Sequence, residues 1–458
     1  MNRYSQVFLE PSGGVPAADV YRLRREALLG KLESIGIFNG IEREPGSEEV
    51  FASTWTRFVQ DPAFLFLTGV NQAGCKLLLD PFAENVRERD VLFLPVKDAN
   101  KEFWTGAKLA YSVEGLDEMR RLTGFETILP EREFWDCLSR KVAARRPEFL
   151  EAFYLEFLSE GKPRSVTGDH NAKFAEELRH RFEPQTEIRS LAEKHFAQRI
   201  VLDPLRIEDV RRAENVSRKA FVELLGNLKG MKSEREAGLF LDYRMQVRSD
   251  GDLAFPTIVA NGKNACCLHY AKKDEPLEPG RLLLLDFGVR VGTQHSDISR
   301  TVPVSGRFNP LQRILYSIVL DAQKFHAKNV KPGKKLADLD LLVWDFIENA
   351  LSERFRSIGG KCGLLYEKRP HGVSHLIGEQ IHEGDPFRLY AKRPLEPGMM
   401  ISNEPGLYGH FEIDLENVHY AEDIGIRIEN DLLVTEGGCE DLSQDIPREI
   451  DELETLLA

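Results

Sequence analysis

Residues 281–301, RLLLLDFGVRVGTQHSDISRT, decide the fold of the second half of the chain. The four leucines predict a buried strand, and Asp286 follows them directly. A turn over residues 291–293 and a returning strand would bring Asp297 beside Asp286. Two neighbouring carboxylates repel each other unless a divalent cation lies between them. The alternative is an ordinary surface hairpin, in which Asp286 lies at the exposed end of its strand and Arg300 pairs with one of the aspartates.

A second motif concentrates imidazole side chains. Residues 371–382, HGVSHLIGEQIH, hold three of the chain's 11 histidines, namely His371, His375 and His382. The first two have the spacing of the helical zinc motif H-E-x-x-H, but Gly372 stands where that motif has its glutamate. A hydrogen-bonded structural histidine explains any one of the three, whereas three within twelve residues indicate a site.

Two glutamates add to these candidate aspartates and histidines. Glu404 in MISNEPGLY and Glu429 in GIRIEND each end an apolar strand-like segment, and each alone is explained as a solvent-facing side chain. Taken together, four carboxylates and one imidazole are a ligand set that Mn²⁺, Co²⁺ or Zn²⁺ accepts. Four negative charges balance two divalent ions, and metals about 3.5–4 Å apart would hold a hydroxide between them. The combination predicts a hydrolytic centre.

The composition excludes several other classes of protein. The 458 residues suggest two to three domains, and 61 Lys and Arg against 74 Asp and Glu give a net charge of −13. That balance argues against a nucleic-acid or anionic-membrane surface. The six cysteines form no CxxC motif, the first residues contain no apolar signal-peptide run, and no apolar stretch approaches the ~20 residues of a membrane span. We therefore expect a reduced, soluble protein of the cytoplasm.

The order of predicted elements divides the chain. Strands and helices alternate through residues 1–200, which favours an α/β domain with a mainly parallel or mixed sheet. Long helices and then strand-rich segments follow over residues 201–458, which favours an α+β domain. The predicted strands include residues 64–68 in the first domain and residues 265–270 in the second.

The four motifs, in this order and spacing over residues 250–435, resemble the pita-bread metallopeptidases of peptidase family M24, which include methionine aminopeptidase, prolidase, creatinase and aminopeptidase P. The resemblance implies a pita-bread catalytic domain at the C-terminus. It also implies five metal ligands, which are Asp286, Asp297, His375, Glu404 and Glu429. Asp297 and Glu429 would bridge two metals, Asp286 would complete one metal site, and His375 with Glu404 would complete the other.

The first half carries a resemblance of its own. YRLRREALLGKL at 21–32, QDPAFLFLTG at 60–69 and EFWTG at 102–106 are similar to the creatinase-type N-terminal domain of the prolidase and aminopeptidase P branch. The H-x-x-S-H form of residues 371–375 is closer to aminopeptidase P. The resemblance implies that the N-terminal domain shapes the cleft and supplies the contacts of a homodimer or homotetramer.

The function implied by this resemblance is that of an Xaa-Pro aminopeptidase, which removes the N-terminal residue from peptides with proline in second position. Two divalent ions would serve as cofactors, with Mn²⁺ expected and Co²⁺ or Zn²⁺ as alternatives. The alternative functions are a prolidase restricted to Xaa-Pro dipeptides and a non-catalytic interaction protein on the same fold.

The same resemblance implies functions for further residues. Glu404 is the expected proton shuttle, and His269 and His382 match the family's substrate-side histidines. The candidates for orienting the ligands or binding substrate are His371, Tyr408 and Arg427, for which plain packing is the alternative. The chain departs from the family's usual pattern at Gln294, Glu379 and Gln380, none of which is an expected ligand.

Overall fold

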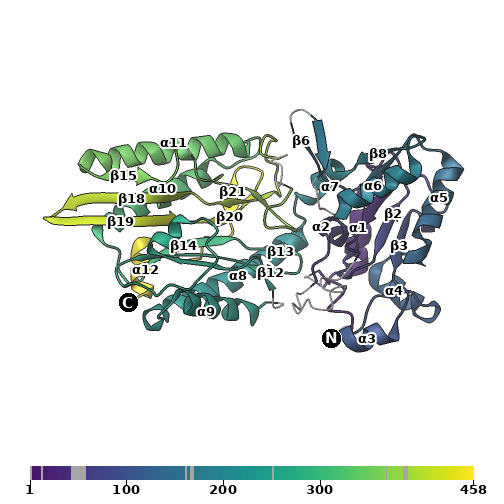
Figure 1. Cartoon of the computed structure of the whole chain (residues 1–458), viewed down its shortest axis with the longest axis horizontal. Coiled ribbons are helices and arrows are strands. Elements are labelled where there is room, and N and C mark those ends of the chain that lie inside the picture. Colours follow the sequence, from purple (N-terminus) through teal and green to yellow (C-terminus); the bar gives the residue numbers. More distant parts are fainter. Residues whose placement is uncertain are drawn as a thin grey trace. The chain divides into compact units, whose positions relative to one another are not determined.

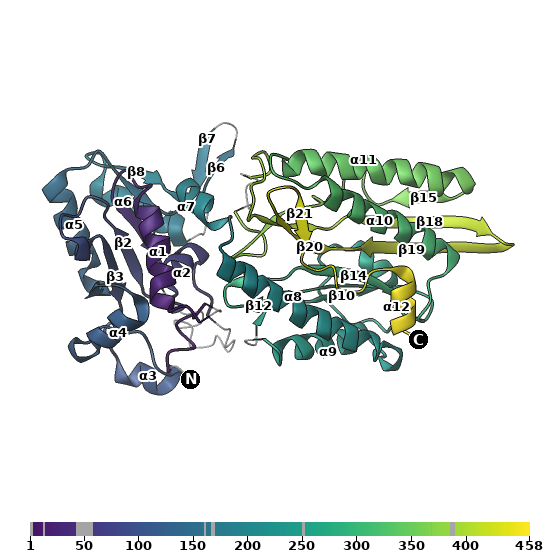
Figure 2. The same ribbon diagram turned by 180° about the vertical axis from the view of Figure 1, so that it is seen from behind.

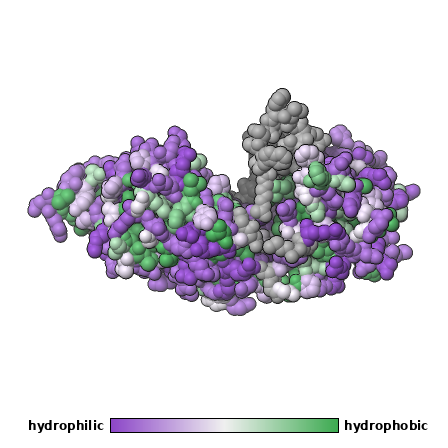
Figure 3. Space-filling model, turned by 90° about the horizontal axis from the view of Figure 1, so that it is seen from below, coloured by the Kyte–Doolittle hydropathy of each residue, from purple (hydrophilic) through white to green (hydrophobic). Residues whose placement is uncertain are grey.

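The structure is a computed structural model of the whole chain, and it describes residues 3–11, 14–42, 58–159, 162–165, 170–249, 252–367, 369–384 and 390–458. The chain divides into two compact units, Met1–Arg199 and Ile200–Ala458. All six cysteines are free. Among the described residues, no helix combines the length and the apolar character that a membrane crossing requires. Figure 3 shows a face on which hydrophobic residues lie in scattered patches among hydrophilic ones.

The first unit contains a six-stranded mixed sheet in the order β4-β3-β2-β1-β5-β8. Its strands are β1 (Gly36–Asn39), β2 (Lys76–Leu79), β3 (Asp90–Leu94), β4 (Thr127–Pro130), β5 (Phe149–Ala152) and β8 (Glu187–Ser190). The pairs β1–β5, β5–β8 and β3–β4 are parallel, whereas β1–β2 and β2–β3 are antiparallel. A separate hairpin joins β6 (Glu156–Ser159) and β7 (Lys162–Ser165).

Helices cover this sheet. They are α1 (Ala17–Leu29), α2 (Pro62–Thr68), α3 (Ala99–Thr105), α4 (Leu116–Thr123), α5 (Phe134–Arg145), α6 (His170–Phe182) and α7 (Ala192–Arg199). Apolar residues of α5 and α6 form one core with β1, β2, β3, β5 and β8. Helix α1 lies over the sheet on the side seen in Figure 2. The first unit is therefore the layered α/β domain that the sequence predicts.

The strand predicted for residues 64–68 is wrong, because this segment is the short helix α2. Asp61 caps it by accepting hydrogen bonds from the backbone N–H groups of Ala63 and Phe64, and Pro62 occupies the first turn. Gly69 ends it in the left-handed region at φ +69°. Since the helix is buried on all sides, its sequence has no polar face that would indicate the helical period.

The second unit contains antiparallel strands between two helix pairs. Figures 1 and 2 show α10 and α11 on one side of the strands and α8 and α9 on the other. The helices are α8 (Pro204–Leu225), α9 (Glu234–Gln246), α10 (Pro310–Asn329), α11 (Leu336–Arg354) and α12 (Ile450–Leu456). One large apolar core joins α8, α9, α10 and α11 to the strands.

The described strands of this unit form four small sheets, and each is antiparallel throughout. The first consists of β10 (Ile258–Asn261), β11 (Leu282–Phe287) and β14 (Ile298–Pro303), and the second of β9 (Asp252–Leu253), β12 (Val289–Val291) and β13 (Gln294–His295). The third consists of β15 (Lys361–Leu364), β18 (Gly406–Leu415) and β19 (Val418–Arg427). The fourth consists of β16 (Leu376–Ile377), β17 (Met400–Asn403), β20 (Asn430–Val434) and β21 (Cys439–Asp441).

Candidate metal centre

The leucine run and the predicted turn form as expected. Leu282–Phe287 is the buried strand β11, and a tight turn at Gly292 and Thr293 joins β12 to β13. Asp286 pairs in register with Ser299 on β14, and Asp297 immediately precedes that strand. The two aspartates are only 9% and 5% exposed. The surface-hairpin alternative is therefore wrong.

Arg300 also contradicts that alternative, because it pairs with neither aspartate. Its five N–H groups are taken by neutral acceptors, which are the carbonyl oxygens of Ser299, Glu429, Ile446 and Pro447 and the side-chain oxygen of Asn430. The guanidinium therefore ties β14 to the segment that carries Glu429. The backbone N–H of Glu429 also donates to the carbonyl oxygen of Ser299, at 3.0 Å.

The remaining expected ligands lie at the ends of neighbouring strands. His375 directly precedes β16, Glu404 directly follows β17, and Glu429 lies between β19 and β20. Ser402 binds His375 twice, because its backbone N–H donates to the carbonyl oxygen of His375 and its hydroxyl accepts from the backbone N–H. Short strands of different sheets thus bring together side chains that are far apart in the sequence.

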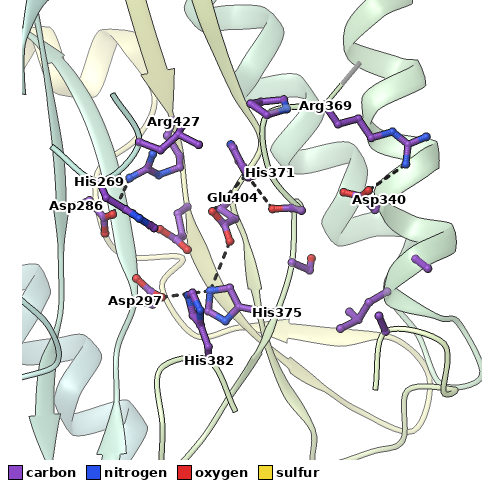
Figure 4. A pocket seen from close by; sticks show the side chains of 18 of the residues that line it. His269, Asp286, Asp297, Asp340, Arg369, His371, His375, His382, Glu404 and Arg427 are labelled. Atoms are coloured by element: carbon purple, nitrogen blue, oxygen red, sulfur yellow. Dashed lines mark hydrogen bonds and ion pairs between the residues drawn. The ribbon is translucent and has the colours of Figure 1, made fainter. Parts of the chain in front are cut away.

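Figure 4 shows Asp286, Asp297, His375 and Glu404 gathered in one pocket, which Glu429 also lines. The Nε2 atom of His375 lies 3.5 Å from an oxygen of Asp297 and 3.5 Å from an oxygen of Glu404. Asp297, His375 and Glu429 each offer a ligand atom within 4.8 Å of the others. One oxygen of Asp286 accepts from Arg427 at 2.6 Å, and the other has no hydrogen-bond partner among the described residues.

These atoms fit a divalent cation. Nδ1 of His375 donates to the carbonyl oxygen of Leu376 at 3.1 Å, so that in the neutral imidazole Nε2 presents its lone pair to the carboxylates of Asp297 and Glu404. Acceptors that face acceptors in a buried place need a cation between them. The unpartnered oxygen of Asp286 points to the same requirement.

The electrostatics of the carboxylates agree with this conclusion. Burial, together with the negative charge of Glu429, raises the pKa of Glu404 to about 8. Burial and mutual repulsion also hold the pKa values of Asp297 and Glu429 well above the ordinary range of carboxyl groups. Bringing three ionised carboxylates together therefore costs free energy, which a bound cation recovers.

A hydrogen-bonded chain lies beside the ligands and contains the three candidates for ligand orientation. Arg427 donates to Asp286, to the hydroxyl of Ser299 at 2.8 Å and to the hydroxyl of Tyr408 at 3.3 Å. The hydroxyl of Tyr408 lies 3.0 Å from Nε2 of His371. Because Nδ1 of His371 donates to the carbonyl oxygen of Gly372, its Nε2 accepts the hydrogen of Tyr408. These hydrogen bonds favour a part in orienting the ligands over plain packing, and that part stays a prediction.

His269 and His382 line the same pocket. The ring of His382 lies 4.2 Å from the ring of His375, measured between centroids. His269 follows a 3₁₀ turn at Gly262–Cys266, so the strand predicted for residues 265–270 is wrong. The buried carboxylate of Glu234 shapes this loop, because it accepts hydrogen bonds from Asn261, Asn264, Tyr270 and Glu275. A local apolar pattern gives no sign of such a distant partner.

The pocket around these groups has a volume of about 650 Å³. The clustered carboxylates line one side, and residues of α11 together with the segment before His371 line the other. Gln294, Glu379 and Gln380 are not among its lining residues. Gln294 is buried beside Thr293, and Glu379 is buried 3.6 Å from Arg206.

Three further residues in or beside the site were not predicted from the sequence. His326 on α10 is buried, with Nδ1 2.9 Å from the side-chain oxygen of Asn403 and Nε2 3.2 Å from the hydroxyl of Ser374. It thus holds the neighbours of two expected ligands. Burial lowers the pKa of His326 to about 4, so it stays neutral. Asp340 and Arg369 form an ion pair in the pocket wall. None of the three belongs to a recognisable motif.

Comparison with known proteins identifies the protein family. Residues 208–436 match the model of metallopeptidase family M24, and residues 21–149 match that of the aminopeptidase P N-terminal domain. The chain belongs to metallopeptidase family M24. The predictions of this family, of a metal-dependent peptidase and of a pita-bread domain behind a creatinase-type N-terminal domain are confirmed. Membership of this family implies bound divalent metal ions.

Individual relatives show which members of this family the chain is similar to. Mouse Xaa-Pro aminopeptidase 3 is 29% identical over 416 residues, which cover 87% of this chain and 76% of the relative. Xaa-Pro aminopeptidase 2 of Streptomyces coelicolor is 34% identical over 274 residues, which cover 57% of each protein. Among solved structures, aminopeptidase PepP of Pseudomonas aeruginosa superposes with a TM-score of 0.76 at 25% identity, covering 96% of this chain and 98% of the other.

Proposed function

We propose that the protein is an Xaa-Pro aminopeptidase that hydrolyses the bond between an N-terminal residue and a following proline, and that it works with two divalent metal ions, Mn²⁺ in the first place. The convergence of four carboxylates and one imidazole in a single pocket carries this proposal. The relatives named Xaa-Pro aminopeptidase support the substrate class.

In this proposal Asp286, Asp297, His375, Glu404 and Glu429 would hold the two metals, and Asp297 and Glu429 would be the ligands shared between them. Two ions bound there would supply Lewis-acid chemistry and lower the pKa of water. Arg427 fixes Asp286 and Ser299, so that Asp286 presents its second oxygen to the cluster. The ligands are thereby oriented before a substrate arrives.

Glu404 is the proposed proton shuttle. It takes a proton from the attacking water and returns it to the prolyl nitrogen as the peptide bond breaks. The hydroxyl of Ser402 donates to one of its oxygens at 3.3 Å, and its carboxylate lines the pocket. The shuttle is needed because the prolyl nitrogen leaves as an amine and carries no hydrogen beforehand.

His269 and His382 complete the proposed site. Their imidazoles face the pocket and would stabilise the negative charge that develops on the scissile carbonyl oxygen or hold the prolyl carbonyl. Proline offers no N–H to a partner in the protein, so it is selected by the shape of the pocket and not by a hydrogen bond.

The test compares an Xaa-Pro-Yaa tripeptide with the matching Xaa-Pro dipeptide, each with and without Mn²⁺, by product analysis. We expect release of the free N-terminal residue from the tripeptide only when metal is present. Cleavage of the dipeptide alone would identify a prolidase. A protein that neither binds two equivalents of Mn²⁺ nor cleaves either peptide would be the non-catalytic alternative.

A further inference from the structure

The pocket has a second charged feature, on the side away from the metal-binding carboxylates. Asp340 on α11 and Arg369 form an ion pair there, with Nη1 of Arg369 3.1 Å from Oδ2 of Asp340. Figure 4 shows the pair beside the helix, with His371 and Glu404 between it and Asp286. Neither residue is part of the metal cluster, and the proposed reaction uses neither.

Asp340 is firmly held in this place. Its Oδ1 atom accepts a hydrogen bond from the backbone N–H of Val373 at 2.9 Å, while Oδ2 pairs with Arg369. One helical turn further along α11, the indole N–H of Trp344 donates to the carbonyl oxygen of His371 at 3.2 Å. Two side chains of a rigid helix thus fix the segment from Arg369 to Val373, so the position of Arg369 is defined.

Arg369 keeps donor capacity for a ligand. A guanidinium has five N–H groups, and within the described part of the chain the one hydrogen-bond partner of Arg369 is Asp340. Its side chain is 34% exposed and lines the cavity. The apolar residues that line the same cavity include Leu336, Ala337, Leu341, Pro370 and Ala391. An apolar surrounding strengthens an ionic hydrogen bond.

The arrangement favours an anionic ligand over a cationic one. Both oxygens of Asp340 already accept hydrogen bonds, from Val373 and Arg369, and its side chain is only 21% exposed. The guanidinium has the larger unused capacity, because it is the more exposed partner and donates to Asp340 alone among the described residues, and it binds carboxylates in a planar, often bidentate geometry. A lysine side chain of a substrate would meet the positive charge of Arg369 beside the less exposed carboxylate of Asp340.

We propose that Arg369, held by Asp340, is a specificity-determining residue that selects peptides with a carboxylate at this side of the pocket. The carboxylate is either an acidic side chain next to the scissile bond or the free C-terminus of a short peptide. The proposal rests on the proposed function for the identity of the substrate as an Xaa-Pro peptide, but the preference for a carboxylate is also measurable as binding.

The test uses Mn²⁺-loaded protein and six peptides. Ala-Pro-Ala-amide is the neutral reference, Ala-Pro-Ala adds a free C-terminus, and Asp or Lys replaces the first or the third residue of the amide. We expect one carboxylate-bearing position to raise kcat/KM about tenfold over the reference, and lysine there to lower it. The amidated and free peptides distinguish a C-terminal carboxylate from an acidic side chain.

Two variants are expected to change the carboxylate preference in opposite directions. In Arg369→Gln the guanidinium is gone, so kcat/KM for the carboxylate-bearing peptide should lie within about twofold of kcat/KM for the neutral reference. Asp340→Asn should increase the preference, because it removes the competing charge while its amide oxygen still accepts from Val373. Arg356→Gln is the matched control, since Arg356 pairs with Glu348 beyond the pocket lining and its loss should leave the preference as in the wild type.

The same peptides are also titrated calorimetrically into the metal-loaded protein. If no peptide is cleaved but carboxylate-bearing peptides bind better and lose this advantage in Arg369→Gln, the proposed reaction fails while the subsite stands. An equal preference in the wild type and in Arg369→Gln would overturn the subsite, as would a wild type without any carboxylate preference in both measurements. A circular dichroism spectrum checks that each variant is folded.

Discussion

At the scale of single residues, the protein assembles a divalent-metal site from side chains that are each unremarkable in the sequence. Asp286 and Glu404 look like the ends of ordinary strands until the fold brings both into one pocket, where Glu404 lies beside His375. The deciding observation is chemical. The Nε2 atom of the half-buried His375 faces carboxylate oxygens of Asp297 and Glu404, and one oxygen of Asp286 is left without a hydrogen bond in the described structure.

Asp297→Asn and Glu429→Gln test the proposed bridging ligands. Each change removes a negative oxygen donor from both metals, so we expect loss of at least one metal equivalent and a fall of at least about 100-fold in kcat. Metal analysis of the purified variants and steady-state kinetics give the two readouts. Asp423→Asn, an exposed residue that pairs with His410, is the control. Full Mn²⁺ content with undiminished turnover in either variant would show that the residue does not bridge.

Tyr408→Phe tests the hydrogen-bonded chain beside the ligands. The change leaves the aromatic ring in place but takes the hydroxyl from between Arg427 and His371, so Nε2 of His371 loses its donor. We expect kcat to fall about tenfold while metal content stays at the wild-type value. Kinetics and metal analysis check this together. Unchanged kinetics would assign Tyr408 to packing alone.

At the scale of secondary-structure elements, the sequence predicts well where a pattern is local. The leucine run 282–285 and the turn at 292–293 are confirmed because strand burial and turn geometry depend on neighbouring residues. The strand predicted for residues 64–68 is wrong because a helix buried on all sides shows no helical period in its sequence. The strand predicted for residues 265–270 is wrong because that loop depends on the distant Glu234. His326 could not be found from sequence, since its partners Ser374 and Asn403 meet it only in the fold.

Helix α10 provides the element-scale prediction. His326→Phe fills a similar volume but deletes the hydrogen bonds to Ser374 and Asn403, which flank His375 and Glu404. We expect the affinity for Mn²⁺ to fall about 10- to 100-fold, as when other residues that orient metal ligands are lost. His326→Gln can keep one donor and one acceptor and should restore part of the affinity. Isothermal titration calorimetry with Mn²⁺ measures both.

The control for that experiment separates metal binding from general stability. Leu320→Ala lies on the same helix, is buried, and should lower the free energy of unfolding by about 2–4 kcal/mol. We expect its affinity for Mn²⁺ to remain close to that of the wild type. If His326→Phe and Leu320→Ala lose Mn²⁺ affinity equally, His326 has no specific part in positioning the ligands.

At the scale of the whole molecule, the net charge of −13 partly reflects the metal site. Two divalent ions would change it to about −9, and the carboxylates that they neutralise belong to one cluster in the second unit. The expected cytoplasmic location and the homodimer or homotetramer remain predictions, and light scattering of the purified protein measures the assembly. The proposed part of the first unit in subunit contacts depends on the same measurement. Its proposed part in shaping the cleft also remains a prediction.

Stability should depend on pH and metal together. Raised carboxyl pKa values in the metal-free fold mean that the folded state binds more protons than the unfolded state, so this cluster stabilises the fold at low pH. That contribution fades as pH rises from the ordinary carboxyl range toward about 8, the pKa of Glu404. We therefore expect Mn²⁺ to raise the Tm of chelator-treated protein more at about pH 8.5 than at about pH 6. An equal shift in Tm at both pH values would contradict this linkage.

The central claim is that two divalent ions, held by the five clustered ligands, carry the hydrolysis of Xaa-Pro bonds. The most direct measurement titrates metal-free protein with Mn²⁺ while recording both bound metal and the release of the N-terminal residue from an Xaa-Pro-Yaa peptide. The account predicts no cleavage without metal and saturation of binding and activity at two equivalents per chain. Full activity without added metal, or two bound equivalents without any cleavage, would contradict it.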